Sequence, residues 1–107
     1  MSRPEPRLGN PKNTIEILQK YKFVFQKKFG QNFLIDEHVL DKIISAAGIG
    51  SDDFVVEIGP GIGTMTQYLA YAARGVAAVE IDKALIPILQ DTLSLYDNVT
   101  VINEDVL

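Results

Sequence analysis

Three glycines between a hydrophobic run and a helical pattern are the residues of this sequence best suited to hold a ligand. Residues 54–58 form a short β-branched run, and Gly59, Gly61 and Gly63 follow it directly. Glycine permits positive φ and lets a ligand approach the backbone closely. A tight turn without a ligand needs fewer glycines, so the composition favours a ligand-binding loop.

Carboxylates stand at the ends of the next two hydrophobic runs. Glu80 ends the second run, 21 residues after the first glycine, and Asp105 follows the third. A carboxylate at the first place can accept hydrogen bonds from both hydroxyls of a ribose, and one at the second can accept a bond from an adenine amino group. Ile81 can pack on the face of the base. Together the three positions predict a site for an adenosine cofactor.

The spacing of the glycines separates two kinds of adenosine cofactor. A dinucleotide fingerprint reads Gly-x-Gly-x-x-Gly. Here the glycines stand at alternate positions, and Thr64 occupies the place of the third glycine of that fingerprint. A fragment of a nicotinamide-dependent oxidoreductase is therefore an alternative that the spacing disfavours.

The elements that must position these residues alternate between strand and helix. Runs at 54–58, 76–80 and 99–102 are typical of buried strands, and helical patterns fill 64–74 and the stretch that Asp82 caps. Strand, helix, strand, helix, strand predicts a parallel, doubly wound α/β sheet with right-handed crossovers. The first strand lacks its expected neighbour on one side, which makes it a candidate edge for self-association.

The front of the chain is expected to be less regular. Residues 1–12 are rich in Pro, Arg and Asn and are interpreted as a flexible basic arm. A short helix over 15–21, capped by Asn13 or Thr14, and an irregular segment over 23–34 follow. A helix then runs from Asp36 to Gly48, with an apolar face expected to hold Val39, Leu40, Ile43, Ile44 and Ala47.

Charge is unevenly distributed, and several functional classes are excluded by composition. Residues 1–30 carry seven basic and two acidic residues, whereas residues 31–107 carry three basic and twelve acidic ones. A basic front favours contact with phosphates, although a solvated tail explains it equally well. There is no cysteine, so disulfides and thiolate metal sites are excluded, and no metal is expected. No run reads as a membrane span or a signal peptide, so a cytoplasmic location is expected.

Four stretches resemble the ribosomal RNA adenine dimethyltransferase family of the KsgA/RsmA type, which is related to the Erm resistance methyltransferases. They are residues 27–34 (Lys-Lys-Phe-Gly-Gln-Asn-Phe-Leu), 56–63, 79–82 and 103–107. Gly-Gln-Asn-Phe-Leu is specific to this family, whereas the glycine loop alone indicates any class I methyltransferase. The resemblance implies a Rossmann-like class I methyltransferase fold. Residues 13–107 would be its N-terminal part, truncated after the third of three parallel strands with flanking helices.

The resemblance also implies a cofactor, a reaction and residue roles. S-adenosylmethionine would donate two methyl groups to the exocyclic amine of each of two adjacent adenosines in small-subunit (16S) ribosomal RNA, during ribosome assembly. The partners would be that RNA and the pre-ribosomal subunit. The implied cofactor-binding residues are Gln31, Asn32 and Leu34 at the methionine end, Gly59 and Gly61 in the loop, Glu80 at the ribose, and Ile81 and Asp105 at the adenine.

The residues that would carry out catalysis are not expected in this chain. In the family, an Asn-Leu-Pro-Tyr type motif after a fourth strand positions the target amine, and this sequence has neither the motif nor the strand. No catalytic residue is therefore assigned, and the 107 residues alone are expected to be inactive. A non-catalytic RNA-binding module that has kept the fold is the alternative that the basic front leaves open.

Overall fold

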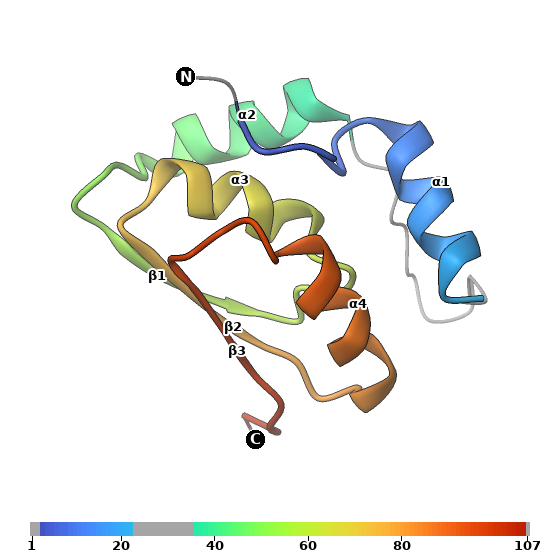
Figure 1. Ribbon diagram of the computed structural model, residues 1–107. Helices are drawn as coiled ribbons and strands as arrows, with labels where there is room; N and C mark the ends of the chain where they lie inside the picture. Colours follow the sequence, from blue (N-terminus) through green and yellow to red (C-terminus); the bar gives the residue numbers. More distant parts are fainter. Residues whose placement is uncertain (1–2, 23–35, 107) are drawn as a thin grey trace.

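The computed structural model describes residues 3–22 and 36–106, which form three strands and four α-helices (Figure 1). In chain order the elements are α1 (Pro11–Lys20), α2 (Glu37–Ala47), β1 (Phe54–Ile58), α3 (Thr64–Ala72), β2 (Gly75–Val79), a 3₁₀ turn (Lys83–Leu85), α4 (Ile86–Thr92) and β3 (Val99–Ile102). The order of strands and helices after residue 53 is the one that the sequence predicts.

The sheet is parallel throughout, with the strand order β1-β2-β3. Val56 of β1 pairs with Ala77 of β2, and Ala77 pairs in turn with Thr100 of β3. The carboxyl ends of all three strands therefore meet at one edge of the sheet. This confirms the predicted α/β architecture of parallel strands with flanking helices.

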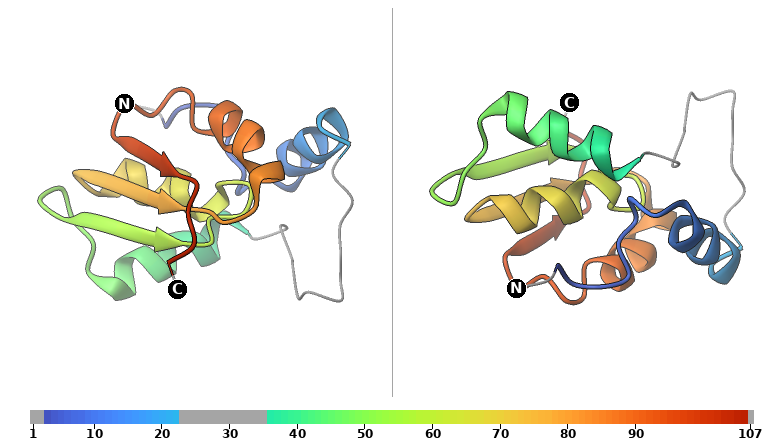
Figure 2. Two further views of the ribbon diagram at one scale, coloured as in Figure 1. Left: turned by 90° about the horizontal axis from the view of Figure 1, so that it is seen from below. Right: turned by 90° about the horizontal axis from the view of Figure 1, so that it is seen from above.

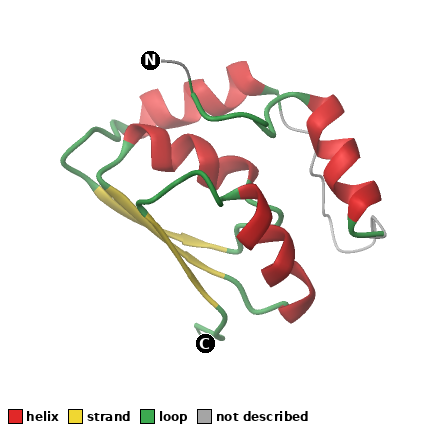
Figure 3. Ribbon diagram, in the orientation of Figure 1, coloured by secondary structure: helices red, strands yellow, loops and turns green. Residues whose placement is uncertain are grey.

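Helices cover only one face of the sheet in the described part of the chain (Figures 2 and 3). Both crossovers step in the same direction across the sheet, and right-handed crossovers of that kind place their helices, α3 and α4, on the same face. On the opposite face Phe54, Val56 and Ile58 are 67%, 60% and 57% exposed. The first strand is thus half exposed and not fully buried as predicted.

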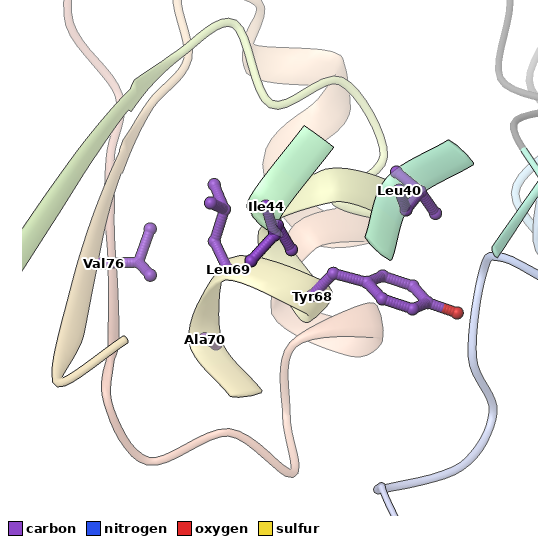
Figure 4. Close-up of a cluster of buried hydrophobic side chains, with 6 residues drawn as sticks. All are labelled: Leu40, Ile44, Tyr68, Leu69, Ala70 and Val76. Carbon is purple, nitrogen blue, oxygen red and sulfur yellow. The ribbon is translucent and has the colours of Figure 1, made fainter. Parts of the chain in front are cut away.

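The main core lies between α2, α3 and β2 (Figure 4). Leu40 and Ile44 of α2 pack against Leu69 of α3, and their cluster extends to Val76 in the sheet. The apolar face predicted for α2 is too wide, because Val39, Ile43 and Ala47 are exposed. Only the stripe that faces α3 is covered among the described residues.

Residues 3–10 are packed against the domain, which differs from the flexible arm expected over 1–12. Leu8 is fully buried in a second cluster with Ile17 of α1, Ile62 of the glycine loop and Ile88 of α4. Helix α1 also begins earlier than predicted, because the Asn10 side chain accepts a hydrogen bond from the Lys12 amide and proline occupies the first helical position.

The other helix ends follow from recognisable caps. Asp36 caps α2, and Gly48 ends it in the left-handed conformation, as predicted. Asp82 caps the 3₁₀ turn that leads into α4, which leaves Pro87 within the first turn of α4, where a missing amide costs nothing. Helix α3 ends at Ala72, two residues before the predicted end. In the described part of the chain no helix is both long and apolar enough to cross a membrane.

Candidate functional site

The glycine loop connects β1 to α3 at the carboxyl edge of the sheet. Gly59, Gly61 and Gly63 have φ angles of +72°, +63° and +94°, a region that side chains other than glycine rarely adopt. A Cβ atom on Gly59 would meet no atom within 4 Å, so the backbone there borders open space. A Cβ atom on Gly63 would lie 2.8 Å from the Thr92 hydroxyl, so this glycine lets α4 approach the loop.

The Glu80 carboxylate is buried at the end of β2 and is fixed in place by two backbone amides. Its Oε1 accepts a hydrogen bond from the Gly61 amide at 3.2 Å, and its Oε2 accepts one from the Asp82 amide at 3.0 Å. A carboxylate offers about four acceptor positions. Glu80 therefore ties the glycine loop to β2 and still has lone pairs for ligand hydroxyls.

The end of β3 is aligned with the end of β2 by one amide side chain. Asn103 donates from Nδ2 to the carbonyl oxygens of Glu80 at 2.7 Å and Ile81 at 3.3 Å. The Glu80 amide donates to the Ile102 carbonyl at 2.8 Å. These hydrogen bonds extend the pairing of the two strands beyond their last residues. Residues 104–106 therefore lie beside Glu80 and Ile81.

A cavity of about 220 Å³ opens at the three strand ends. It is lined by Ile58, Gly59, Val79, Glu80, Ile81, Glu104, Asp105 and Val106. Four of the predicted site residues thus meet in one place, namely Gly59, Glu80, Ile81 and Asp105. Gly61 does not line the cavity but holds Glu80. Gln31, Asn32 and Leu34 lie outside the described residues.

Sequence reasoning missed four residues of this lining. Ile58 and Val79 supply apolar surface, and Glu104 and Val106 flank the predicted Asp105. Ile58 and Val79 are the last residues of their strands, and Glu104 and Val106 follow β3. These positions could have been recognised in the sequence, because ligands of open sheets bind outside the carboxyl ends of strands. The carboxylates of Glu80, Glu104 and Asp105 add hydrogen-bond acceptors to a lining that is mostly apolar, which suits the hydroxyls and the base of a nucleoside.

A second carboxylate, the half-buried Glu57, lies behind the loop on β1. Its Oε1 accepts a hydrogen bond of 2.5 Å from the Thr66 hydroxyl of α3. Burial raises the pKa of the Glu57 carboxyl above its usual value, and the bond from Thr66 opposes this shift. Glu57 is therefore a half-buried acid that links β1 to α3.

Three of the described cations of the basic front are paired with acidic groups of the chain. The pairs are Arg3 with Glu37 and Asp41, Arg7 with Glu5 and Glu37, and Lys20 with Asp91. These pairs reduce the positive field that the sequence suggests for contact with phosphates. Lys27 and Lys28, two further basic residues of this front, lie outside the described residues.

No group of three potential metal-ligating side chains exists in the described ranges 3–22 and 36–106. The chemistry available at the cavity is therefore that of hydrogen-bond acceptors, backbone amides and apolar contacts. Such a site can bind and orient a nucleoside.

Solved structures with this fold identify the class of protein. The 23S ribosomal RNA methyltransferase ErmE is similar with a TM-score of 0.63 and 40% identity, over 69% of this chain and 30% of its own. A dimethyladenosine transferase from Plasmodium falciparum is similar with a TM-score of 0.60 and 37% identity, over 66% of this chain and 26% of its own. Together with the glycine loop and the strand-end carboxylates, these similarities give the class of fold, which is that of the class I methyltransferases.

Sequence comparison gives the particular family. The family described as Ribosomal RNA adenine dimethylase matches residues 22–107. The Ribosomal RNA small subunit methyltransferase A of Lachnoclostridium phytofermentans is 74% identical over 94% of this chain and 35% of its own length, and that of Alkaliphilus oremlandii is 57% identical over the same shares. The chain belongs to the ribosomal RNA adenine dimethylase family, which contradicts the nicotinamide alternative. It spans about 35% of the length of these relatives.

Proposed function

We propose that this chain supplies the cofactor-binding part of an enzyme that dimethylates the exocyclic amines of two adjacent adenosines in small-subunit ribosomal RNA. The observation that carries the proposal is the cavity where the glycine loop meets the carboxylates of Glu80 and Asp105. Relatives named for the small-subunit RNA support the substrate class. Modification of this RNA belongs to ribosome assembly, in the cytoplasm.

The residues of the cavity fit S-adenosylmethionine as the cofactor. Glu80 retains acceptor positions for the two ribose hydroxyls, and Asp105 can accept a bond from the adenine amino group while Ile81 covers the base. Gly59 borders open space, so a ligand can approach its backbone. Gln31, Asn32 and Leu34 would hold the methionine end, a role that rests on the family resemblance.

The work of the described residues in this reaction is binding and orientation. The cofactor, held at its ribose by Glu80 and at its adenine by Asp105 and Ile81, would supply an electrophilic methyl carbon for transfer to the exocyclic amine. Holding the sugar and base fixes where that carbon lies, and alignment of reacting atoms accounts for a large part of such rate accelerations. No residue lining the cavity is assigned to the proton transfer, so the chain alone is expected to be inactive.

The alternative is a non-catalytic module that binds RNA through the basic front. The ion pairs of Arg3, Arg7 and Lys20 weigh against a dominant contribution from the described part of that front. RNA binding that weakens steeply as salt rises, with no cofactor binding, would favour this alternative.

A calorimetric titration tests the proposed cofactor site. The chain is titrated with S-adenosylhomocysteine and with NAD, and the titration is repeated on Asp105→Ala and on the exposed control Asp52→Ala. We expect S-adenosylhomocysteine alone to bind, about tenfold more weakly to Asp105→Ala, because a hydrogen bond to a charged group contributes about that factor. Equal affinity of both variants, or binding of NAD instead, would overturn the proposal.

A further inference from the structure

The peptide plane between Ile62 and Gly63 in the glycine loop is held at both ends. The Thr92 hydroxyl of α4 donates to the Ile62 carbonyl at 2.8 Å, and the Gly63 amide donates to the Pro60 carbonyl at 3.0 Å. In a trans peptide the carbonyl and the amide point in opposite directions. Two partners on opposite sides therefore fix the orientation of this plane, and with it the course of the loop.

Thr92 is itself held by a buried amide side chain of α3. Gln67 is 2% exposed, and its Nε2 donates to the Thr92 carbonyl at 2.8 Å. Nε2 donates a second bond to the Pro6 carbonyl at 3.1 Å, and Oε1 accepts a bond from the Leu8 amide at 2.8 Å. Because carbonyls only accept and backbone amides only donate, these partners admit one orientation of the Gln67 amide.

The bonds form one continuous path from the N-terminal segment through α3 and α4 to the glycine loop. The loop is supported along this path on the side away from the cavity, whereas Gly59 borders the cavity on the other side. The packing of the loop supports the same conclusion. Ile62 is fully buried in a cluster with Leu8 and residues of α1 and α4. A Cβ atom on Gly63 would lie 2.8 Å from the Thr92 hydroxyl and 3.2 Å from Leu89, so α4 lies close against the loop.

We propose that Thr92 and Gln67 are positioning residues that set the glycine loop for cofactor binding, although neither lines the cavity. This inference rests on the proposed function. The adenine of the ligand would be bound by residues at the ends of β2 and β3, whereas binding of the rest of the ligand would depend on the glycine loop. Loss of the hydrogen bonds behind the loop should therefore lower the affinity for S-adenosylhomocysteine more than the affinity for adenosine.

The test compares S-adenosylhomocysteine with adenosine on three variants of the 107-residue chain. Thr92→Val keeps the shape of the side chain and removes the hydroxyl, Thr92→Ser keeps the hydroxyl, and Thr100→Val makes the same change at an exposed position of β3. We expect Thr92→Val to lower the affinity for S-adenosylhomocysteine about tenfold and that for adenosine less than about threefold, because the buried Ile62 carbonyl loses its partner. Thr92→Ser and Thr100→Val should keep the original ratio.

The outcomes separate this inference from the proposed function. An equal loss of both affinities in Thr92→Val would show a general structural role and overturn the inference, as would unchanged binding of S-adenosylhomocysteine. If the unsubstituted chain, folded by circular dichroism, bound no S-adenosylhomocysteine, the proposed function would fail and the inference with it. Should Thr92→Val not fold, Thr92→Ala gives the same comparison, since it removes the hydroxyl without placing a methyl group against Ile62.

Discussion

The two glutamates near the glycine loop, buried Glu80 and half-buried Glu57, differ in the number of hydrogen bonds that they accept. Glu80 accepts hydrogen bonds from two backbone amides, at Gly61 and Asp82. Among the described residues the Glu57 carboxylate accepts one bond, from the Thr66 hydroxyl. Burial with few donors disfavours the charged form, which is why the pKa of Glu57 is raised. Glu80 is thus held by two donors beside the cavity, whereas Glu57 destabilises the fold when ionised.

The raised pKa of Glu57 predicts that stability falls as pH rises above its ordinary value of 4.5. The folded state keeps the proton to a higher pH than the unfolded state does, so stability is fully present below the unfolded value and is lost as pH rises through the folded value. Glu57→Gln removes the charge and can still accept from Thr66. We expect its melting temperature to exceed that of the unsubstituted chain by a few degrees at neutral pH and to approach it near pH 4.

Thermal melts followed by circular dichroism between about pH 4 and pH 8 measure this difference. Glu16→Gln, at an exposed position of α1, is the matched control and should leave the pH dependence unchanged. A Glu57→Gln variant that is less stable than the unsubstituted chain at neutral pH would contradict the prediction, because the ionised carboxylate would then be stabilising.

At the scale of elements, the strands and the loop could be predicted because their signals are local. A β-branched run bounded by glycine or polar residues predicts a strand wherever it packs, and β1 and β3 have the predicted ends. The start of α1 was missed although its signal is also local, since Asn10 before Pro11 is a capping pattern. The exposure of Val39 and Ile43 could not be predicted, because periodicity shows an apolar face but not which part of it is covered.

The roles of Gln67 and Thr92 behind the glycine loop could not be predicted either, because a helical pattern does not show which of its residues are covered. Gln67 and Thr92 are polar residues inside helical patterns, and such residues usually face solvent. Their function depends on partners 59 and 30 residues away, at Leu8 and Ile62. The strand-end residues Glu80 and Asp105 were accessible to prediction because parallel strands bring their carboxyl ends together whatever the side-chain packing is.

The packing of the N-terminal segment on α2 and α3 gives an element-scale prediction. The Arg3 guanidinium pairs with Glu37 and Asp41 and lies 5.0 Å and 4.8 Å from the ring centroids of Tyr68 and Tyr71. Arg3→Ala should therefore lower the free energy of unfolding by about 1 kcal/mol, as expected for a partly exposed network with cation–π contacts. Urea unfolding measures the change, which should shrink at 1 M salt because screening weakens ion pairs.

Lys12→Ala is the control for this change, because Lys12 is an exposed cation of the same front. It should leave the urea midpoint nearly unchanged. The same small effect for Arg3→Ala would mean that the ion pairs and ring contacts of Arg3 do not hold the N-terminal segment in solution.

At the scale of the whole molecule, the sheet is covered on one face and apolar on the other. Phe54, Val56 and Ile58 project from the uncovered face, and Ala77 and Val79 continue it onto β2. Strand β1 is also an edge of the sheet. Exposed apolar surface beside an unpaired strand edge favours association between chains. The isolated chain is therefore expected to self-associate through β1 as its concentration rises.

A lysine on the open face should suppress this association. Val56 and Leu95 are similarly exposed, at 60% and 65%, but only Val56 lies in the sheet. Val56→Lys places like charges opposite each other when two open faces meet, whereas Leu95→Lys adds the same charge away from the sheet. Sedimentation velocity over a range of concentrations should show association of the unsubstituted chain and of Leu95→Lys, and a monomer for Val56→Lys. If the unsubstituted chain is a monomer at every concentration, the open face does not associate. If both lysines suppress association equally, net charge controls association, and the face of β1 does not.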